Sequence, residues 1–128
     1  MIRWMCKGKI HRATVTESDL DYEGSICMDR ELMKAAAIRP YEMVQVTSLR
    51  NAALWRTYAI PVPDPGKVAL NGPPAHLFKP GDLVVILSMA LVDESQLSGL
   101  RPRVVLVNEE NQIVGLKEVD LQEKEWDA

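Results

Sequence analysis

The sequence predicts a small, mainly β domain with one or two short helices. Short runs of β-branched and apolar residues recur along the chain, separated by glycine, proline, asparagine or aspartate. One segment has the clear apolar spacing of an amphipathic helix. A chain of 128 residues fits one compact domain, residues 1–128, with little apolar content to spare. Many short strands with few helices are typical of a β-barrel.

Strand-like patterns occur in six places. They are Ile10–Thr16, Met43–Leu49, Trp55–Val62, Leu83–Leu91, Val104–Val107 and Ile113-Val114. The polar stretch Asn108-Glu109-Glu110-Asn111 predicts a turn that joins the last two as a hairpin. The prolines of Pro61–Gly66 predict a loop, and Pro80-Gly81-Asp82 predicts a turn before the next strand.

The clearest helix is predicted for Asp29–Ile38. Asp29 is a suitable N-cap, and the apolar stripe consists of Leu32, Met33 and Ala36. Arg39-Pro40 is expected to end this helix, because a residue before proline is disfavoured in the helical conformation. A second short helix is predicted near Asp93–Leu100.

Charge and hydropathy argue against several classes of partner. The net charge is −3 and no stripe of Lys and Arg is present, so nucleic acid is not expected as the main partner. Met1–Met5 lacks the apolar core of a signal peptide. The longest apolar run, Leu83–Val92, is too short to span a bilayer. We therefore expect a soluble, cytoplasmic protein with no membrane partner.

Cys6 and Cys27 are the only cysteines of the chain. Neither stands in a CxxC motif, so no metal site is expected. Without a signal sequence they are predicted to be reduced, and to be buried as small apolar residues rather than joined in a disulfide.

The stretch Tyr22-Glu23-Gly24-Ser25 carries the most informative motif. Taken alone, Gly-Ser is a common turn dipeptide. Gly8-Lys9-Ile10-His11-Arg12 precedes it, and Thr57-Tyr58-Ala59-Ile60 follows it. Further along the chain lie Asn71-Gly72, Ala75-His76, Gly81-Asp82 and Arg101-Pro102. In residue type, order and spacing, these segments resemble the aspartate 1-decarboxylase family over nearly the whole chain.

The resemblance implies a fold, a cofactor and an assembly. The fold is a six-stranded double-psi β-barrel, and the assembly is a homotetramer. Family members cut themselves before a serine, which here means a cut between Gly24 and Ser25 into fragments 1–24 and 25–128. Ser25 then becomes a pyruvoyl group, a ketone that forms a Schiff base with an amino acid and accepts electrons as carbon dioxide leaves. Some members need a maturation factor for this step.

The Gly24-Ser25 pair suits such a cleavage chemically. The Ser25 hydroxyl must attack the carbonyl carbon of Gly24, and a residue without a Cβ lets the backbone take a strained conformation that exposes this carbonyl. Nearby donors must then stabilise the tetrahedral oxyanion.

The resemblance also assigns roles at other positions. Thr57 would support the cleavage by hydrogen bonding near the Gly24 carbonyl. Tyr58 would return a proton to the carbanion after decarboxylation, a general-acid role that a phenol can fill. The expected substrate-binding residues are Lys9, Asn71, Gly72 and Arg56, and the expected supporting residues are His11 and Tyr22.

Each of these positions has a simpler structural interpretation. Lys9 and His11, two apart on a strand, share a face that could be merely solvated. Tyr58 could be an ordinary barrel tyrosine, and Asn71-Gly72 is a common turn pair. Without the resemblance the simpler interpretations are favoured.

The chain departs from the family pattern in the expected pocket. Leu54 occupies the position of a carboxylate-binding arginine. Arg56, on the same face of a regular strand, is either its replacement from a shifted position or a surface residue. Pro73-Pro74 replaces small residues whose N–H groups face the substrate, although proline has no N–H group. Thr47 replaces a frequent tryptophan.

Three hypotheses follow. The leading one is a pyruvoyl-dependent decarboxylase, a carboxy-lyase that converts L-aspartate to β-alanine and carbon dioxide for pantothenate biosynthesis. The second keeps the cofactor but changes the substrate to another amino acid, such as a substituted aspartate. The third is a non-catalytic paralogue of the barrel.

Overall fold

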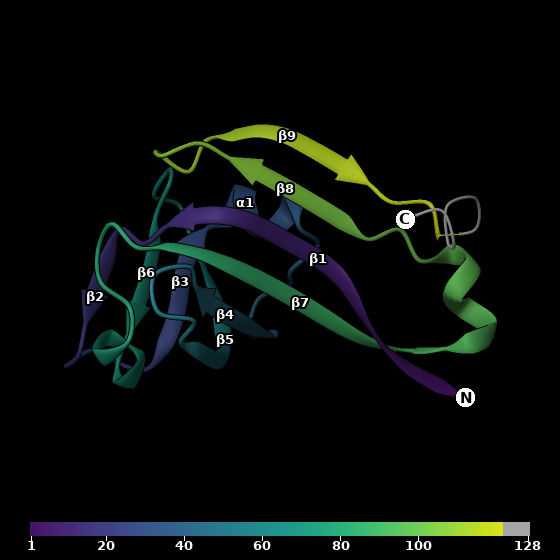
Figure 1. The fold of residues 1–128 in the computed structure, drawn as a ribbon, viewed down its shortest axis with the longest axis horizontal. Helices are drawn as coiled ribbons and strands as arrows, with labels where there is room; N and C mark the ends of the chain where they lie inside the picture. Colours follow the sequence, from purple (N-terminus) through teal and green to yellow (C-terminus); the bar gives the residue numbers. More distant parts are fainter. Residues whose placement is uncertain (122–128) are drawn as a thin grey trace.

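The computed structural model describes residues 1–121, which form a nine-stranded mixed β-sheet with one short α-helix and two 3-10 helices (Figure 1). The strands are β1 Ile2–Thr14, β2 Glu17–Asp19, β3 Ser25–Asp29, β4 Met43–Ser48, β5 Leu54–Val62, β6 Val68–Asn71, β7 Leu83–Asp93, β8 Arg103–Val107 and β9 Ile113–Glu118. The helices are α1 Arg30–Ala35, η1 Pro73–His76 and η2 Glu94–Gly99.

The strands follow the spatial order β2-β6-β3-β5-β4-β7-β1-β8-β9. Three of the pairings, β1 with β8, β2 with β6 and β3 with β5, are parallel, and the others are antiparallel. This arrangement confirms the mainly β fold class. The double-psi connectivity of a closed barrel stays a prediction from the resemblance.

The predicted strands and the hairpin of β8 and β9 are confirmed. The short strands β2, β3 and β6 were not predicted. Every residue of β6 is buried, and in β3 only the last residue is not. A strand that is covered on both faces loses the alternation of polar and apolar residues by which strands are recognised.

The helix α1 is shorter than expected. Asp29 caps it as predicted, because its carboxylate accepts a hydrogen bond from the backbone N–H of Glu31 at 2.8 Å. The helix ends at Ala35, and Ala37 has a positive φ of 58°. The prediction that Arg39-Pro40 ends the helix was therefore wrong, because the left-handed residue Ala37 redirects the chain first. The second predicted helix is present as η2.

The core lies on the inner face of the curved sheet. Its largest fully buried side chains include Phe78, Ile10, Ile26, Leu70 and Ile86. Burying a side chain of this size stabilises the fold by about 1.5–3 kcal/mol relative to its exposure. This core holds β3, β5 and β6 in place around the Gly24-Ser25 junction.

One end of the molecule is a two-stranded ribbon that extends beyond the rest of the sheet. It pairs the start of β1 with the end of β7, from Cys6↔Met89 to Ile2↔Asp93 (Figure 1). Trp4 and Leu91 are paired there, and they are 62% and 74% exposed. We call residues 2–6 and 89–93 the β1/β7 ribbon.

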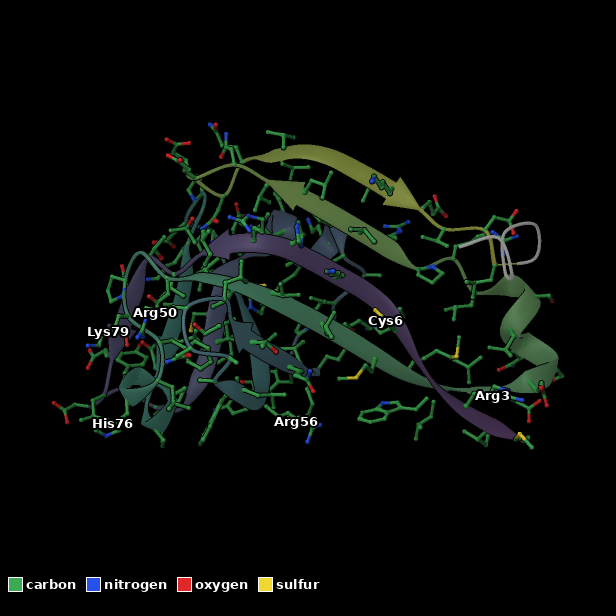
Figure 2. The ribbon with its side chains drawn as sticks, in the orientation of Figure 1. Arg3, Cys6, Arg50, Arg56, His76 and Lys79 are labelled. Atoms are coloured by element: carbon green, nitrogen blue, oxygen red, sulfur yellow. The ribbon has the colours of Figure 1, made fainter. Side chains whose placement is uncertain are left out.

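The two cysteines differ. Both are free thiols, and Cys27 is buried as predicted. Cys6 is exposed on the β1/β7 ribbon, so the prediction that it is buried was wrong (Figure 2). Its strand continues past the edge of the core, where β7 is the one strand within residues 1–121 that pairs with it. No helix within residues 1–121 is long and apolar enough to cross a membrane.

Candidate active site

The Gly24-Ser25 junction lies where the chain enters the sheet. Ser25 is the first residue of β3, and it pairs with Asn71, the last residue of the antiparallel strand β6. Ser25 is 1% exposed and Asn71 is 7% exposed. Residues paired in this way point to the same face of the sheet, so the hydroxyl and the amide share a buried space.

Gly72 holds the other side of the junction. Its φ is +78°, and a Cβ added to it would lie 2.7 Å from Cα of Gly24 and 3.0 Å from the Gly24 nitrogen. The Gly72 N–H donates to the Asp19 carbonyl at 2.8 Å, which fixes the turn. Glycine is required here for both its left-handed conformation and its close approach to Gly24.

Pro73 and Pro74 begin the 3-10 helix η1 directly after Gly72. Proline is tolerated in the first turn of a helix, where its missing N–H would have no helical partner. Cδ of Pro73 lies 3.6 Å from the position of a Cβ added to Gly24, so the ring packs beside the junction. The Ala75 N–H donates to the Gly72 carbonyl at 2.9 Å. The prolines therefore shield the junction, and they offer no backbone donors to a substrate.

Thr57 and Tyr58 lie on β5, the other neighbour of β3. The parallel ladder pairs Ile26 with Ala59, and continuing this register brings Thr57 level with Gly24 and Tyr58 level with Ser25. Thr57 is 6% exposed and faces the core. Tyr58 is half-buried and points to the opposite face of the sheet, the face on which the buried Ser25 side chain also lies. Continued in this way, the ladder gives the candidate catalytic residues adjacent positions on two strands.

Tyr41 is a neighbour of this group that sequence analysis missed. Its ring stacks on the ring of Tyr58, with centroids 5.5 Å apart and planes 5° from parallel. Its N–H donates to the Ala59 carbonyl at 2.7 Å, and its φ is +67°. Tyr41 lies in the turn before β4, seventeen residues before Tyr58, so nothing in the local sequence signals the contact.

Cys27 is the second missed residue. It follows Ser25 by two positions on β3, so the two side chains share a face. Its Sγ atom lies 3.6 Å from Oγ of Ser25, and Nδ2 of Asn71 lies 3.9 Å from the same sulfur. The sequence predicted only a small buried thiol at this position, because the i, i+2 spacing is informative only once β3 is known to be a strand.

Lys9 and Arg56 lie in one row across four strands, which we call the Lys9–Arg56 row. Lys9 on β1 pairs with Leu87 on β7, Leu87 with Gln45 on β4, and Gln45 with Arg56 on β5. Paired residues point to the same face, so both cations lie on the outer face with Tyr58. Three strand spacings separate them, roughly 14 Å along the sheet. One chain does not bring Lys9 next to Ser25.

Arg56 is exposed and has neighbours of its own. Nη2 donates to Oε1 of Gln45 at 3.2 Å, and the guanidinium lies 5.9 Å from the ring centroid of Trp4. Figure 2 shows its side chain extending away from the sheet. Leu54, two residues earlier on β5, is 47% exposed on the same face. The local register therefore allows Arg56 to present its charge to a molecule docked on this face.

His11 lies apart from the junction, and Tyr22 lies at its rim. His11 is on β1, paired with Leu106 of β8, and its Nδ1 atom is buried without a hydrogen-bond partner among residues 1–121. Burial holds the pKa of His11 below its ordinary value, and the positive charges of Lys9, Arg12 and Lys117 lower it further. Tyr22 is 61% exposed, and its carbonyl lies 3.3 Å from a Cβ added to Gly72.

Comparison with known proteins places the chain in a protein family. A family model described as aspartate decarboxylase matches residues 1–114. The chain belongs to the aspartate decarboxylase family. An aspartate 1-decarboxylase of Carboxydothermus hydrogenoformans is 48% identical over 122 residues, which cover 94% of this chain and 96% of that protein. One from Pelotomaculum thermopropionicum is 50% identical over 119 residues, covering 92% of this chain and 90% of its own. The match to the family model covers nearly the whole fold described above, and every candidate site residue lies within the matched range.

Proposed function

We propose that this chain cuts itself between Gly24 and Ser25 and thereby becomes a pyruvoyl-dependent aspartate decarboxylase. The observation that carries the proposal is the buried junction itself, in which Ser25 is 1% exposed and Gly72 closely approaches Gly24. Decarboxylation of L-aspartate to β-alanine is supported by family membership and by the name that its relatives share.

The proposed cleavage consumes water and no other reagent from outside the chain. The Ser25 hydroxyl attacks the Gly24 carbonyl carbon, the C–N bond breaks, and the peptide becomes an ester with a free amine on residue 25. Elimination then breaks the bond between Oγ and Cβ, which releases the Gly24 carboxylate and leaves dehydroalanine. Water replaces the nitrogen, ammonia leaves, and residue 25 becomes a pyruvoyl group.

The residues around the junction fit such a group. Asn71, Gly72 and Pro73 shield it on one side, and β5 with Thr57 and Tyr58 lies on the other. The 6% exposure of Thr57, level with Gly24, supports its role beside the Gly24 carbonyl. A buried donor there strengthens the stabilisation of an oxyanion, because little water screens the interaction.

A ketone at residue 25 supplies the electron sink for loss of the α-carboxylate. The other steps belong to side chains of this chain. Tyr58 lies level with Ser25 on the same face and is proposed to donate a proton from its phenol to the substrate carbon. Tyr41 stacks on its ring and holds the phenol in orientation. Asn71, paired with Ser25, is proposed to orient the bound amino acid.

We further propose that the substrate pocket forms between copies of the chain in a homotetramer. Lys9 and Arg56 are expected to bind substrate carboxylates, yet the Lys9–Arg56 row separates Lys9 from Ser25 within one chain. The exposed apolar side chains of Trp4, Leu91 and Leu54 supply area for such contacts. His11 and Tyr22 would support the pocket from its edges. The free thiols support a reducing compartment, which we take to be the cytoplasm.

A substrate panel on cleaved protein of known pyruvoyl content tests the substrate. L-aspartate is expected to give carbon dioxide and β-alanine faster than L-glutamate, L-asparagine or 3-substituted aspartates. Faster turnover of a substituted aspartate would move the assignment to that substrate, the alternative that the departures at Leu54 and Pro73-Pro74 motivate. No carbon dioxide from any amino acid would point to the non-catalytic paralogue. Cleavage that occurs only in a cell extract would reveal a maturation factor.

A further inference from the structure

The buried hydroxyl of Ser25 has one hydrogen-bond partner among residues 1–121, and that partner is a thiol. Oγ of Ser25 and Sγ of Cys27 lie 3.6 Å apart, and either atom can donate. Both residues are buried, Ser25 at 1% and Cys27 at 9% exposure. Water therefore has little access to the hydroxyl, and its orientation depends on the sulfur.

Asn71 holds the sulfur from the other side. Its side-chain N–H donates to Sγ of Cys27, with Nδ2 at 3.9 Å. The backbone of Asn71 pairs with Ser25, whereas Cys27 pairs with Ala69, a small residue that leaves the thiol room beside the amide. The three side chains therefore form a chain of contacts on one face of β3 and β6, from amide to thiol to hydroxyl.

The contacts restrict the rotation of the Ser25 side chain. A serine hydroxyl otherwise samples three staggered rotamers, and cleavage requires the one that aims oxygen at the preceding carbonyl carbon. Thiol hydrogen bonds are weak, but a buried hydroxyl that loses its only partner also loses its preferred orientation. The i, i+2 geometry of a strand maintains this contact for as long as β3 is paired.

We propose that Cys27 is a positioning residue for self-cleavage, which holds the Ser25 hydroxyl in the orientation that attacks Gly24. The inference rests on the proposed function and extends it to a residue with no assigned role. Cys27 acts before the cut, through Ser25, and forms no bond itself. Its sulfur in turn depends on Asn71, which gives that amide a task in maturation as well as at the substrate.

Two substitutions separate hydrogen bonding from packing. Cys27→Ser keeps a donor and acceptor but loses volume, whereas Cys27→Val keeps roughly the volume but cannot hydrogen-bond. Cys27→Ala removes both without adding bulk. Cys6→Val is the matched control, because Cys6 is an exposed thiol of the β1/β7 ribbon (Figure 2) and lies on neither β3 nor β6.

The measurement is the first-order rate of cleavage of freshly synthesised, uncut chain into fragments 1–24 and 25–128, followed on gels and by intact mass. Cys27→Ser is expected to cleave within about threefold of the wild type, while Cys27→Val and Cys27→Ala cleave about three- to tenfold more slowly. Cys6→Val is expected to match the wild type. Thermal unfolding of each uncut chain reports whether the variant is folded.

Several results would overturn the positioning role while leaving the proposed function intact. Equal rates for all variants would do so, as would a fast Cys27→Val with a slow Cys27→Ser, which would show packing alone. Faster cleavage in Cys27→Ala would show that the thiol restrains the hydroxyl instead. A wild-type chain that never cuts is a different result, because it overturns the proposed function and the positioning role together.

Discussion

The Gly24-Ser25 junction and the Lys9–Arg56 row differ in how completely one chain builds them. The junction is buried, Ser25 pairs with Asn71 of β6, and the ladder of β3 with β5 begins one residue after Ser25, where Ile26 pairs with Ala59. The row lies on the outer face, where exposed Arg56 contacts Gln45 and Trp4. Under the proposed function, one chain supplies the residues for maturation, whereas the substrate pocket is proposed to need a neighbouring copy.

The largest expected effect comes from removing the nucleophile of the junction. Ser25→Ala lacks the hydroxyl that attacks Gly24, so the chain is expected to stay whole and to lose decarboxylase activity completely. Intact mass and carbon dioxide release measure the two effects. The variant should fold normally, because alanine fits where serine is buried; activity in a whole Ser25→Ala chain would refute the cofactor assignment.

Tyr58→Phe tests the proposed general acid, which lies beside the junction and takes no part in the proposed cleavage. The ring keeps its stacking on Tyr41, but the phenol proton is gone. Cleavage is expected to be normal, whereas decarboxylation falls by roughly 10²–10⁴-fold, the usual contribution of a general acid. Tyr41→Phe is the control and is expected to retain turnover. Unchanged turnover in Tyr58→Phe would assign the proton to another group.

Gly72→Ala tests the close approach at the junction. The added Cβ would lie 2.7 Å from Cα of Gly24 at a φ of +78°. We expect destabilisation by about 1–3 kcal/mol and slower cleavage. Gly99→Ala is the matched control, since a Cβ there meets nothing within 4 Å. Thermal unfolding and cleavage rates measure both, and equal behaviour of the two variants would mean that the junction tolerates displacement.

The sequence was informative about the junction because its residues lie in short motifs with a family resemblance. The arrangement around it was less predictable. Cys27 and Asn71 are 44 residues apart, and only the pairing of β3 with β6 joins them. Both strands are almost fully buried and lack alternation, so neither was predicted. The position of Lys9 relative to Arg56 likewise depends on strand order, which the hydrophobic pattern does not encode.

Substitutions in the Lys9–Arg56 row test substrate binding separately from cleavage at the junction. Lys9→Ala and Arg56→Ala are expected to leave cleavage unchanged and to raise KM for aspartate. The loss of one charge-assisted bond is worth about 1.5–3 kcal/mol, or roughly 10–150-fold in kcat/KM. Arg3→Ala, which removes an exposed arginine paired with Glu94, is the control. If Arg56→Ala behaves like Arg3→Ala, Arg56 does not replace the missing arginine.

The smallest effect concerns His11 and pH. Burial and nearby cations lower its pKa, so between that value and 6.5 the unfolded chain binds more protons than the folded one. Stability from this group therefore rises with pH through that window and is lost as pH falls. The melting temperature of the wild type minus that of His11→Gln should increase as pH rises from about 5 to 8.

An intact mass spectrum of the purified wild-type protein is the measurement that decides whether the chain cuts itself at Gly24-Ser25. We expect two fragments, 1–24 and 25–128, and we expect the larger one to be lighter, by the mass of one ammonia, than a fragment that begins with serine. A single uncut chain that remains whole after prolonged incubation, alone and in a cell extract, would contradict this expectation.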